Sequence, residues 1–106
     1  MKIKAGVIIQ GLDLAMRPVL VEASRIWREY KQELVVTAAL DGEHSAGSLH
    51  YYGLALDLRS RDFVEFEDES VAQDLRVALG PDFDVIVHKS HIHVEFQRAL
   101  HDRPVV

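Results

Sequence analysis

The chain has 106 residues, of which 48% are hydrophobic, so residues 1–106 are enough for one compact domain and too few for two. Twelve basic and seventeen acidic residues give a net charge of −5, and the basic residues are scattered, so neither nucleic acid nor an anionic membrane is an expected partner. Cysteine is absent, which excludes disulfides and thiolate metal sites and leaves the six histidines and the carboxylates as metal ligands.

The first ten residues contain two lysines and the short apolar run Val7-Ile8-Ile9. Three apolar residues are far fewer than the core of a signal peptide or a membrane-spanning segment contains. We therefore expect the chain to be synthesised and folded in the cytoplasm.

The first predicted helix covers about residues 13–32, where apolar side chains recur every three or four positions. Pro18 lacks an amide hydrogen and fits best in a first helical turn, so regular helix is expected to begin near Arg17. The apolar face of this helix consists of Met16, Leu20, Ala23, Trp27 and Tyr30.

Two strands are predicted in the middle of the chain. Residues 33–40 are rich in β-branched side chains and are followed by Asp41-Gly42, which is typical of a buried strand that ends in a turn. Residues 54–59 alternate leucine with other residue types, which is the period of a strand that buries one face. Asp57 is therefore expected to point away from the leucines.

A second helix is predicted over about residues 70–79. Ser70 begins a capping-box pattern, and Gly80-Pro81 is a stop signal. The acidic residues within 65–69 are interpreted as solvated side chains that complement the helix dipole, in preference to a calcium site.

Residues 83–87 and 91–96 are two further strand candidates, and the three residues between them indicate a hairpin with a tight turn. The order of elements is then helix, strand, strand, helix, strand, strand. This order predicts an α+β fold in which two helices and a small, mostly antiparallel sheet form separate layers.

The last predicted strand carries polar side chains suited to binding a metal ion. His91, His93 and Glu95 share one parity, so two imidazoles and a carboxylate line a single face. The opposite parity is apolar and would anchor this strand in the core.

His50 and Asp57 are seven residues apart, which corresponds to roughly 23 Å in a fully extended chain. Their side chains can converge only if the chain turns between them. Gly53 provides the expected turn, because glycine adopts backbone angles that are closed to other residues.

Two imidazole nitrogens and one carboxylate oxygen suit zinc and leave a fourth tetrahedral position for water, as in catalytic zinc sites. An isolated histidine is nevertheless more often structural than a metal ligand. The residue types alone therefore do not establish a metal site.

The segment Ser48-Leu49-His50-Tyr51-Tyr52-Gly53-Leu54-Ala55-Leu56-Asp57 and the segment His91-Ile92-His93-Val94-Glu95 together resemble the paired signatures of one superfamily. That superfamily joins D-Ala-D-Ala metallopeptidases, phage L-Ala-D-Glu endolysins and hedgehog signalling domains. The first segment resembles its pattern of Ser, any residue, His, six residues and Asp, and the second resembles the strand with the third ligand. The resemblance covers residues 34–96 and implies a hedgehog-like peptidase fold with His50, Asp57 and His93 as zinc ligands.

The resemblance also implies roles for neighbouring residues. His44 is similar to a hedgehog histidine that precedes the first ligand by six positions, and Ser48 belongs to the first signature. His91 resembles the family histidine that lies beside the metal and can donate a hydrogen bond to the water or the reaction intermediate. From the residues themselves, Arg59 and Arg61 are candidates for clamping a substrate carboxylate.

The general base departs from the family pattern. Relatives usually carry Glu or Asp a few residues before the third ligand, whereas this chain has His88-Lys89-Ser90 there. Histidine can take a proton near neutral pH, so His88 is the expected base. Glu95 is a weaker candidate, because its parity places it one pleat, roughly 7 Å, beyond His93, where it would support the metal site or bind a substrate amine.

The resemblance predicts a zinc peptidase that hydrolyses peptidoglycan stem peptides, either as a D,D-carboxypeptidase or as an L-Ala-D-Glu endopeptidase. Release by a phage lysis system would bring such an enzyme to the cell wall. Two alternatives remain open: a zinc-binding module without hydrolysis, which the missing carboxylate favours, and a structural docking unit of a phage or prophage particle. The bond cleaved and the oligomeric state are left open.

Overall fold

The computed structural model describes residues 1–42 and 48–97. Its strands are β1 (Lys2–Ile3), β2 (Val35–Ala38), β3 (Ala55–Arg59), β4 (Phe83–Val87) and β5 (His91–Phe96). Its helices are α1 (Arg17–Glu29) and α2 (Glu67–Leu79), and two short 3-10 helices are η1 (Leu14–Met16) and η2 (Leu49–Tyr52).

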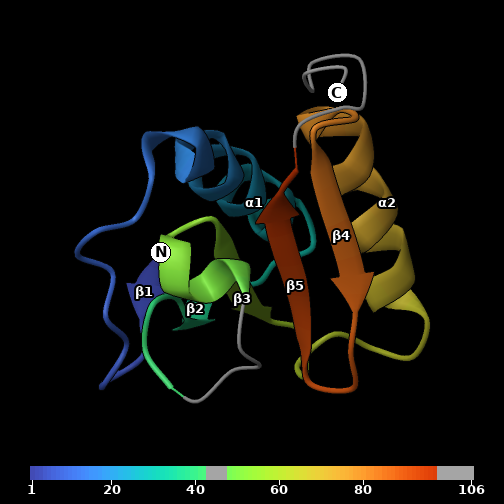
Figure 1. Ribbon diagram of the computed structural model, residues 1–106. Coiled ribbons are helices and arrows are strands. Elements are labelled where there is room, and N and C mark those ends of the chain that lie inside the picture. Colours follow the sequence, from blue (N-terminus) through green and yellow to red (C-terminus); the bar gives the residue numbers. More distant parts are fainter. Residues whose placement is uncertain (43–47, 98–106) are drawn as a thin grey trace.

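The five strands form one sheet in the order β1-β2-β3-β5-β4. All neighbours pair antiparallel except β1 and β2, which are parallel. Figure 1 shows α1 and α2 on one side of the sheet and η2 on the other. The predicted α+β class, with two helices and a mostly antiparallel sheet, is therefore confirmed.

The core lies between the helices and one face of β3 and β5. Leu56 and Leu58 of β3 and Ile92 and Val94 of β5 are fully buried there. The helices contribute the buried residues Val19, Ala23, Ile26, Trp27, Val71, Ala72 and Leu75. Since neighbouring residues of a strand point to opposite faces, the residues between these apolar ones face away from the helices, as predicted for Asp57.

Several predicted boundaries agree closely with the structure. Strands β4 and β5 have the predicted limits, and the turn between them is closed by the His88 amide, which donates to the His91 carbonyl at 2.9 Å. Helix α1 begins at Arg17 and has Pro18 in its first turn. Because proline has no amide hydrogen, this position leaves no helical hydrogen bond unmade.

The predicted start of the second helix is wrong. Helix α2 begins at Glu67, three residues before Ser70, and follows Phe66, whose φ of 70° is left-handed. The Glu67 amide donates to the Val64 carbonyl at 3.0 Å, and its carboxylate accepts from the Val64 amide at 3.3 Å. Acidic side chains therefore occupy the first turn of α2, where they complement the helix dipole.

Strand β1 was not predicted from the sequence. It has two residues, and flanking hydrogen bonds hold it: the Lys2 amide donates to Leu34 at 2.8 Å and the Lys4 amide donates to Val36 at 3.0 Å. Within the described ranges, no helix is both long enough and apolar enough to cross a membrane.

Candidate metal centre

The short helix η2 places His50 over the polar face of the sheet. The Ser48 hydroxyl accepts a hydrogen bond from the His50 amide at 3.3 Å and so caps this turn. Gly53 ends it in the left-handed conformation, with a φ of 71°. The predicted turn between His50 and Asp57 is therefore present at Gly53.

Gly53 is also a point of close packing. A Cβ atom built on it would overlap the carbonyl oxygen of Gly11 and lie 3.1 Å from the backbone nitrogen of Asp13. The Asp13 amide donates to the Gly53 carbonyl at 2.9 Å, which holds the turn against this segment. Both the backbone angle and the space around residue 53 therefore require glycine.

Three side chains from three elements converge beside η2. His50 Nε2 lies 3.2 Å from His93 Nδ1 and 3.2 Å from Asp57 Oδ1, and the last two atoms are 2.9 Å apart. Strand pairing brings Asp57 and His93 together, because they are direct partners in the β3–β5 ladder. Among the described residues, these three form the group that could hold a metal ion.

The second nitrogen of each histidine ring has a partner outside the group. His50 Nδ1 lies 2.7 Å from the Ala39 carbonyl oxygen, which can only accept, so the proton of a neutral His50 is on Nδ1. His93 Nε2 likewise donates to Glu95 Oε1 at 2.8 Å. In the neutral rings, His50 Nε2 and His93 Nδ1 thus carry lone pairs beside Asp57 Oδ1 that a shared cation can bind, whereas in a protonated ring the same nitrogen donates a hydrogen bond to Asp57.

The group is largely withdrawn from solvent: the His50 side chain is 3% exposed and that of Asp57 is 14% exposed. Burial alone would raise the pKa of Asp57, but hydrogen bonds from His50 and His93 outweigh it and hold this pKa well below its ordinary range. The hydrogen bond to Asp57 raises the pKa of His93 against the effect of burial, and Glu95 raises it further. Asp57 is therefore ionised at neutral pH, as a metal ligand must be.

His91 and His88 lie beside the group, toward solvent. His91 Nε2 is 3.8 Å from Asp57 Oδ2, and burial lowers the pKa of His91 more than the Asp57 charge raises it. The exposed His88 ring stacks on His91 with 4.7 Å between centroids, and its centroid is 6.4 Å from that of His93. The predicted base, His88, and the predicted hydrogen-bond donor, His91, therefore both lie near the three predicted ligands.

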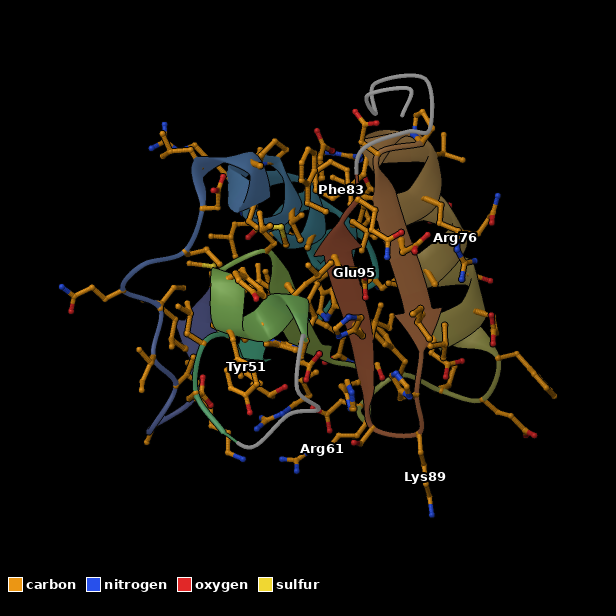
Figure 2. The ribbon with its side chains drawn as sticks, in the orientation of Figure 1. Tyr51, Arg61, Arg76, Phe83, Lys89 and Glu95 are labelled. Atoms are coloured by element: carbon orange, nitrogen blue, oxygen red, sulfur yellow. The ribbon has the colours of Figure 1, made fainter. Side chains whose placement is uncertain are left out.

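The other predicted site residues have distinct positions. Glu95 contacts His93 directly, and its second oxygen accepts a hydrogen bond from Gln97, so both of its oxygens are engaged. Figure 2 shows Glu95 on β5 and Tyr51 of η2 on the same side of the sheet. Arg59 is the partner of His91 in the β3–β5 ladder. His44 lies outside the described residues.

Two contributors were missed from the sequence: the Ala39 carbonyl and the Gln97 side chain. A backbone carbonyl has no residue-type signature, so Ala39 could not have been found from its side chain. Gln97 is two residues after Glu95, and residues two apart in a strand point to the same face. This spacing was the one signal in the sequence that could have indicated the contact of Gln97 with Glu95.

Comparison of the sequence with protein-family models gives no match, and comparison with curated proteins gives no relative. The superfamily suggested by the two signatures therefore remains a prediction. The metal centre itself rests on the geometry described above.

Proposed function

We propose that this chain is a zinc metallopeptidase that hydrolyses peptidoglycan stem peptides, as a D,D-carboxypeptidase or an L-Ala-D-Glu endopeptidase. The observation that carries the proposal is the convergence of His50, Asp57 and His93, with the remaining nitrogen of each ring held by another acceptor. The substrate class comes from the resemblance of the two signature segments.

The distances within the group support zinc. In a tetrahedral site with bonds of about 2.0–2.1 Å, neighbouring ligand atoms lie about 3.3 Å apart. The three separations here are 2.9, 3.2 and 3.2 Å. Two nitrogens and one oxygen are ligands that zinc accepts, and three protein ligands leave one position open, as catalytic zinc sites do.

When bound, zinc would polarise the scissile carbonyl group and lower the pKa of a water molecule. His88 would accept a proton from the attacking water and return it to the leaving amine, which restores the starting form of the imidazole. Its exposure and its stacking on His91 support this role. His91 would donate a hydrogen bond to the oxygen that gains negative charge, and Glu95 would keep His93 oriented.

A second candidate function is a zinc-binding module without hydrolysis. It is favoured by the turn before His91, which contains His88, Lys89 and Ser90 and no carboxylate. In that case zinc would tie η2 to strands β3 and β5 and so stabilise the domain.

Digestion of purified peptidoglycan stem peptides by zinc-loaded protein, with and without chelator, separates the two candidates. A peptidase releases new amino termini, chelator stops the release, and His88→Ala slows it about 10²–10⁴-fold without loss of zinc. Lys89→Ala, which changes the next residue in the same turn, is the matched control and should retain full activity. If the wild type cleaves nothing while His88→Glu does, the natural chain is a binding module.

A further inference from the structure

Strand β2 and the residues just after it contact two of the three candidate ligands. The Ala39 carbonyl accepts a hydrogen bond from His50 Nδ1 at 2.7 Å. The Thr37 hydroxyl donates to the Asp57 carbonyl at 3.3 Å. Neither contact uses an atom of the candidate ligand set, because one involves the opposite nitrogen of the His50 ring and the other involves the backbone of Asp57. This part of the chain can therefore orient both ligands without touching the ion.

Strand β2 is irregular opposite Asp57. Its register with β3 shifts between Val36 and Ala38, so that Thr37 is one extra residue in β2. Such a β-bulge bends its strand, and bulges are over-represented beside functional sites, where they change the direction of nearby groups. Here the bulge coincides with the contact of the Thr37 hydroxyl with Asp57.

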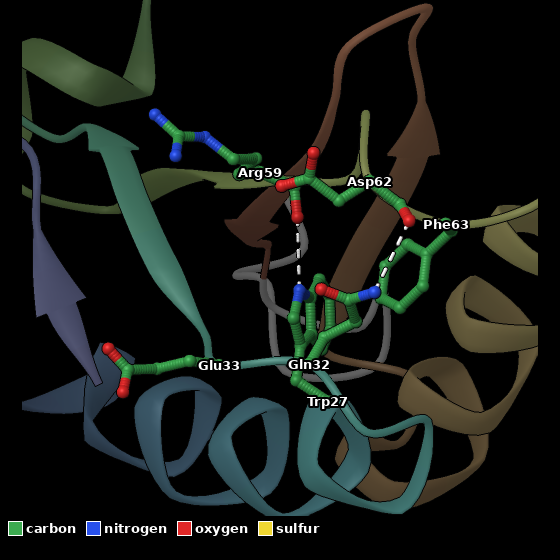
Figure 3. Close-up of a pocket in the computed structure, with 6 residues that line it drawn as sticks. All are labelled: Trp27, Gln32, Glu33, Arg59, Asp62 and Phe63. Atoms are coloured by element: carbon green, nitrogen blue, oxygen red, sulfur yellow. Dashed lines mark hydrogen bonds between the residues drawn. The ribbon is translucent and has the colours of Figure 1, made fainter.

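The backbone of β3 is also held two residues farther along. In an antiparallel strand the carbonyl groups of alternate residues face the same edge, so the Arg59 carbonyl faces the same way as that of Asp57. The buried Trp27 of α1 donates from its indole nitrogen to the Arg59 carbonyl at 3.0 Å, as Figure 3 shows. Side chains from two other elements thus fix β3 at Asp57 and just beyond it.

The peptide group that carries the Ala39 carbonyl is held at both ends. Its amide belongs to Leu40 and donates to the Ile8 carbonyl at 3.0 Å, while its oxygen accepts from His50. Asp41 completes the arrangement, because its Oδ1 atom accepts from the Ile8 amide at 3.0 Å and from the Ala39 amide at 2.9 Å. Asp41 therefore ties the segment after β1 to the end of β2 and fixes the direction of the Ala39 carbonyl.

The direction of this carbonyl decides which nitrogen of His50 is available to a metal ion. A carbonyl oxygen can only accept, so it keeps a proton on Nδ1, and the lone pair of the neutral ring is then on Nε2, 3.2 Å from Asp57 Oδ1. Ala39 is fully buried and the His50 side chain is 3% exposed. A carbonyl that turned away would thus leave a buried Nδ1–H group without an acceptor, which is costly.

We infer that Asp41 is a positioning residue of the metal centre, which fixes the His50 ring through the Ala39 carbonyl, and that Thr37 supports the backbone of Asp57. This inference rests on the metal site of the proposed function and assigns its outer support to the end of β2. Groups that orient metal ligands typically contribute about 10–100-fold to metal affinity. Asp41 acts through one peptide group, so we expect the lower end of this range.

The test compares Asp41→Ala with Asp41→Asn. The amide oxygen of asparagine can still accept from the Ile8 and Ala39 amides, whereas an alanine side chain cannot. Competition with a chromophoric chelator measures zinc affinity, and NMR measures how fast the His50 Nδ1 proton exchanges with water in the metal-free and zinc-loaded protein. We expect Asp41→Ala to lower zinc affinity about 10-fold and to speed this exchange, and Asp41→Asn to retain most of both properties.

Asp74→Ala is the matched control. It also removes a carboxylate that joins two elements, since Asp74 of α2 accepts a hydrogen bond from the Tyr30 hydroxyl at 2.8 Å, but it lies in the helix layer. It should leave zinc affinity and the His50 proton unchanged.

Variants of Thr37 test the inference independently if Asp41→Ala does not fold. Valine keeps the branched shape and lacks the hydroxyl, whereas serine keeps the hydroxyl. Thr37→Val should therefore weaken zinc binding about 2–10-fold, as expected for one hydrogen bond, and Thr37→Ser should not.

Unchanged zinc affinity in both Asp41→Ala and Thr37→Val overturns the inference, and so do equal losses in Asp41→Ala and Asp41→Asn. Lower stability of Asp41→Ala with an unchanged His50 proton also overturns it, because Asp41 is then only a structural residue. A wild type that binds no zinc, but whose His50 proton depends on Asp41, supports the role of Asp41 and contradicts the proposed metallopeptidase.

Discussion

In each histidine of the candidate metal centre, one ring nitrogen contacts a protein group outside the centre and the other ring nitrogen faces Asp57. For His50 the outer partner is a backbone carbonyl, and for His93 it is the Glu95 carboxylate. A carboxylate behind an imidazole fixes the ring and increases its basicity, and loss of such a partner typically lowers metal affinity about 10–100-fold.

We therefore expect Glu95→Gln to weaken zinc binding by about 10–100-fold while the fold is retained, because the amide preserves the size of the side chain but not its charge. Competition with a chromophoric chelator measures this affinity. Asp84→Asn is the matched control, because Asp84 is the partner of Glu95 in the β4–β5 ladder and is exposed. If both variants bind zinc as tightly as the wild type, Glu95 does not support the centre.

Much of the candidate metal centre could be predicted from residue types and from the two-residue alternation of a strand. His91, His93 and Glu95 alternate with apolar residues, and that alternation alone predicts their common face. The convergence of His50 with that face was implied by the resemblance and depends on a turn that the sequence marks only with Gly53. The contact between His50 and Ala39 depends on the three-dimensional path of the backbone, which side-chain identities do not encode.

At the level of elements, η2 joins two of the three ligand positions, and its end at Gly53 determines how they face each other. Strained backbone angles cost roughly 1–3 kcal/mol. We expect Gly53→Ala to lower the free energy of unfolding by more than this, because its Cβ atom would also overlap the carbonyl oxygen of Gly11. Zinc affinity should fall as well, since η2 must shift. Chemical denaturation and chelator competition measure the two effects.

Gly80→Ala provides the matched control for this change. Gly80 also has a positive φ, of 83°, but a Cβ there meets no atom within 4 Å. It should therefore lose stability through backbone strain alone and keep its zinc affinity. Equal losses of stability and affinity in the two variants would show that the contact with Gly11 does not shape the centre.

The elements themselves were predictable to different degrees. The β4–β5 hairpin was predicted to the residue, because strict alternation and a short polar turn leave little freedom. The start of α2 was misplaced, because Phe66 adopts a left-handed conformation that its residue type does not favour and Ser70 offered a more familiar cap. Strand β1 has two residues, which are too few to show the alternation of apolar and polar side chains that predicts a strand, so its pairing with β2 defines it.

At the scale of the whole molecule, the pKa shifts of His93 and His91 predict how the stability of the metal-free domain depends on pH. The hydrogen bond to Asp57 raises the pKa of His93, so its contribution to stability is complete below about pH 6.5 and is lost as pH rises through the raised value. Burial lowers the pKa of His91, so stability also falls as pH drops below about 6.5. The free energy of unfolding should therefore be greatest near pH 6.5, at about the ordinary histidine pKa.

Urea unfolding in the presence of chelator, from about pH 5 to 8.5, measures this profile. His93→Gln should flatten the alkaline side, and His91→Gln should flatten the acidic side. Above neutral pH, zinc affinity should rise while the stability of the metal-free domain falls, because the ion displaces the His93 proton. A metal-free wild type that becomes steadily more stable above about pH 7 would contradict the assigned contact between His93 and Asp57.

The central claim is that one metal ion binds between η2, β3 and β5, and anomalous X-ray diffraction from crystals of the zinc-loaded protein tests it most directly. We expect one zinc peak per chain, about 2.0–2.2 Å from His50 Nε2, Asp57 Oδ1 and His93 Nδ1. Bonding through these particular atoms follows from the contacts of Ala39 and Glu95 with the opposite ring nitrogens. No ordered peak among the three side chains, or zinc held instead by His88 and His91, would contradict the account.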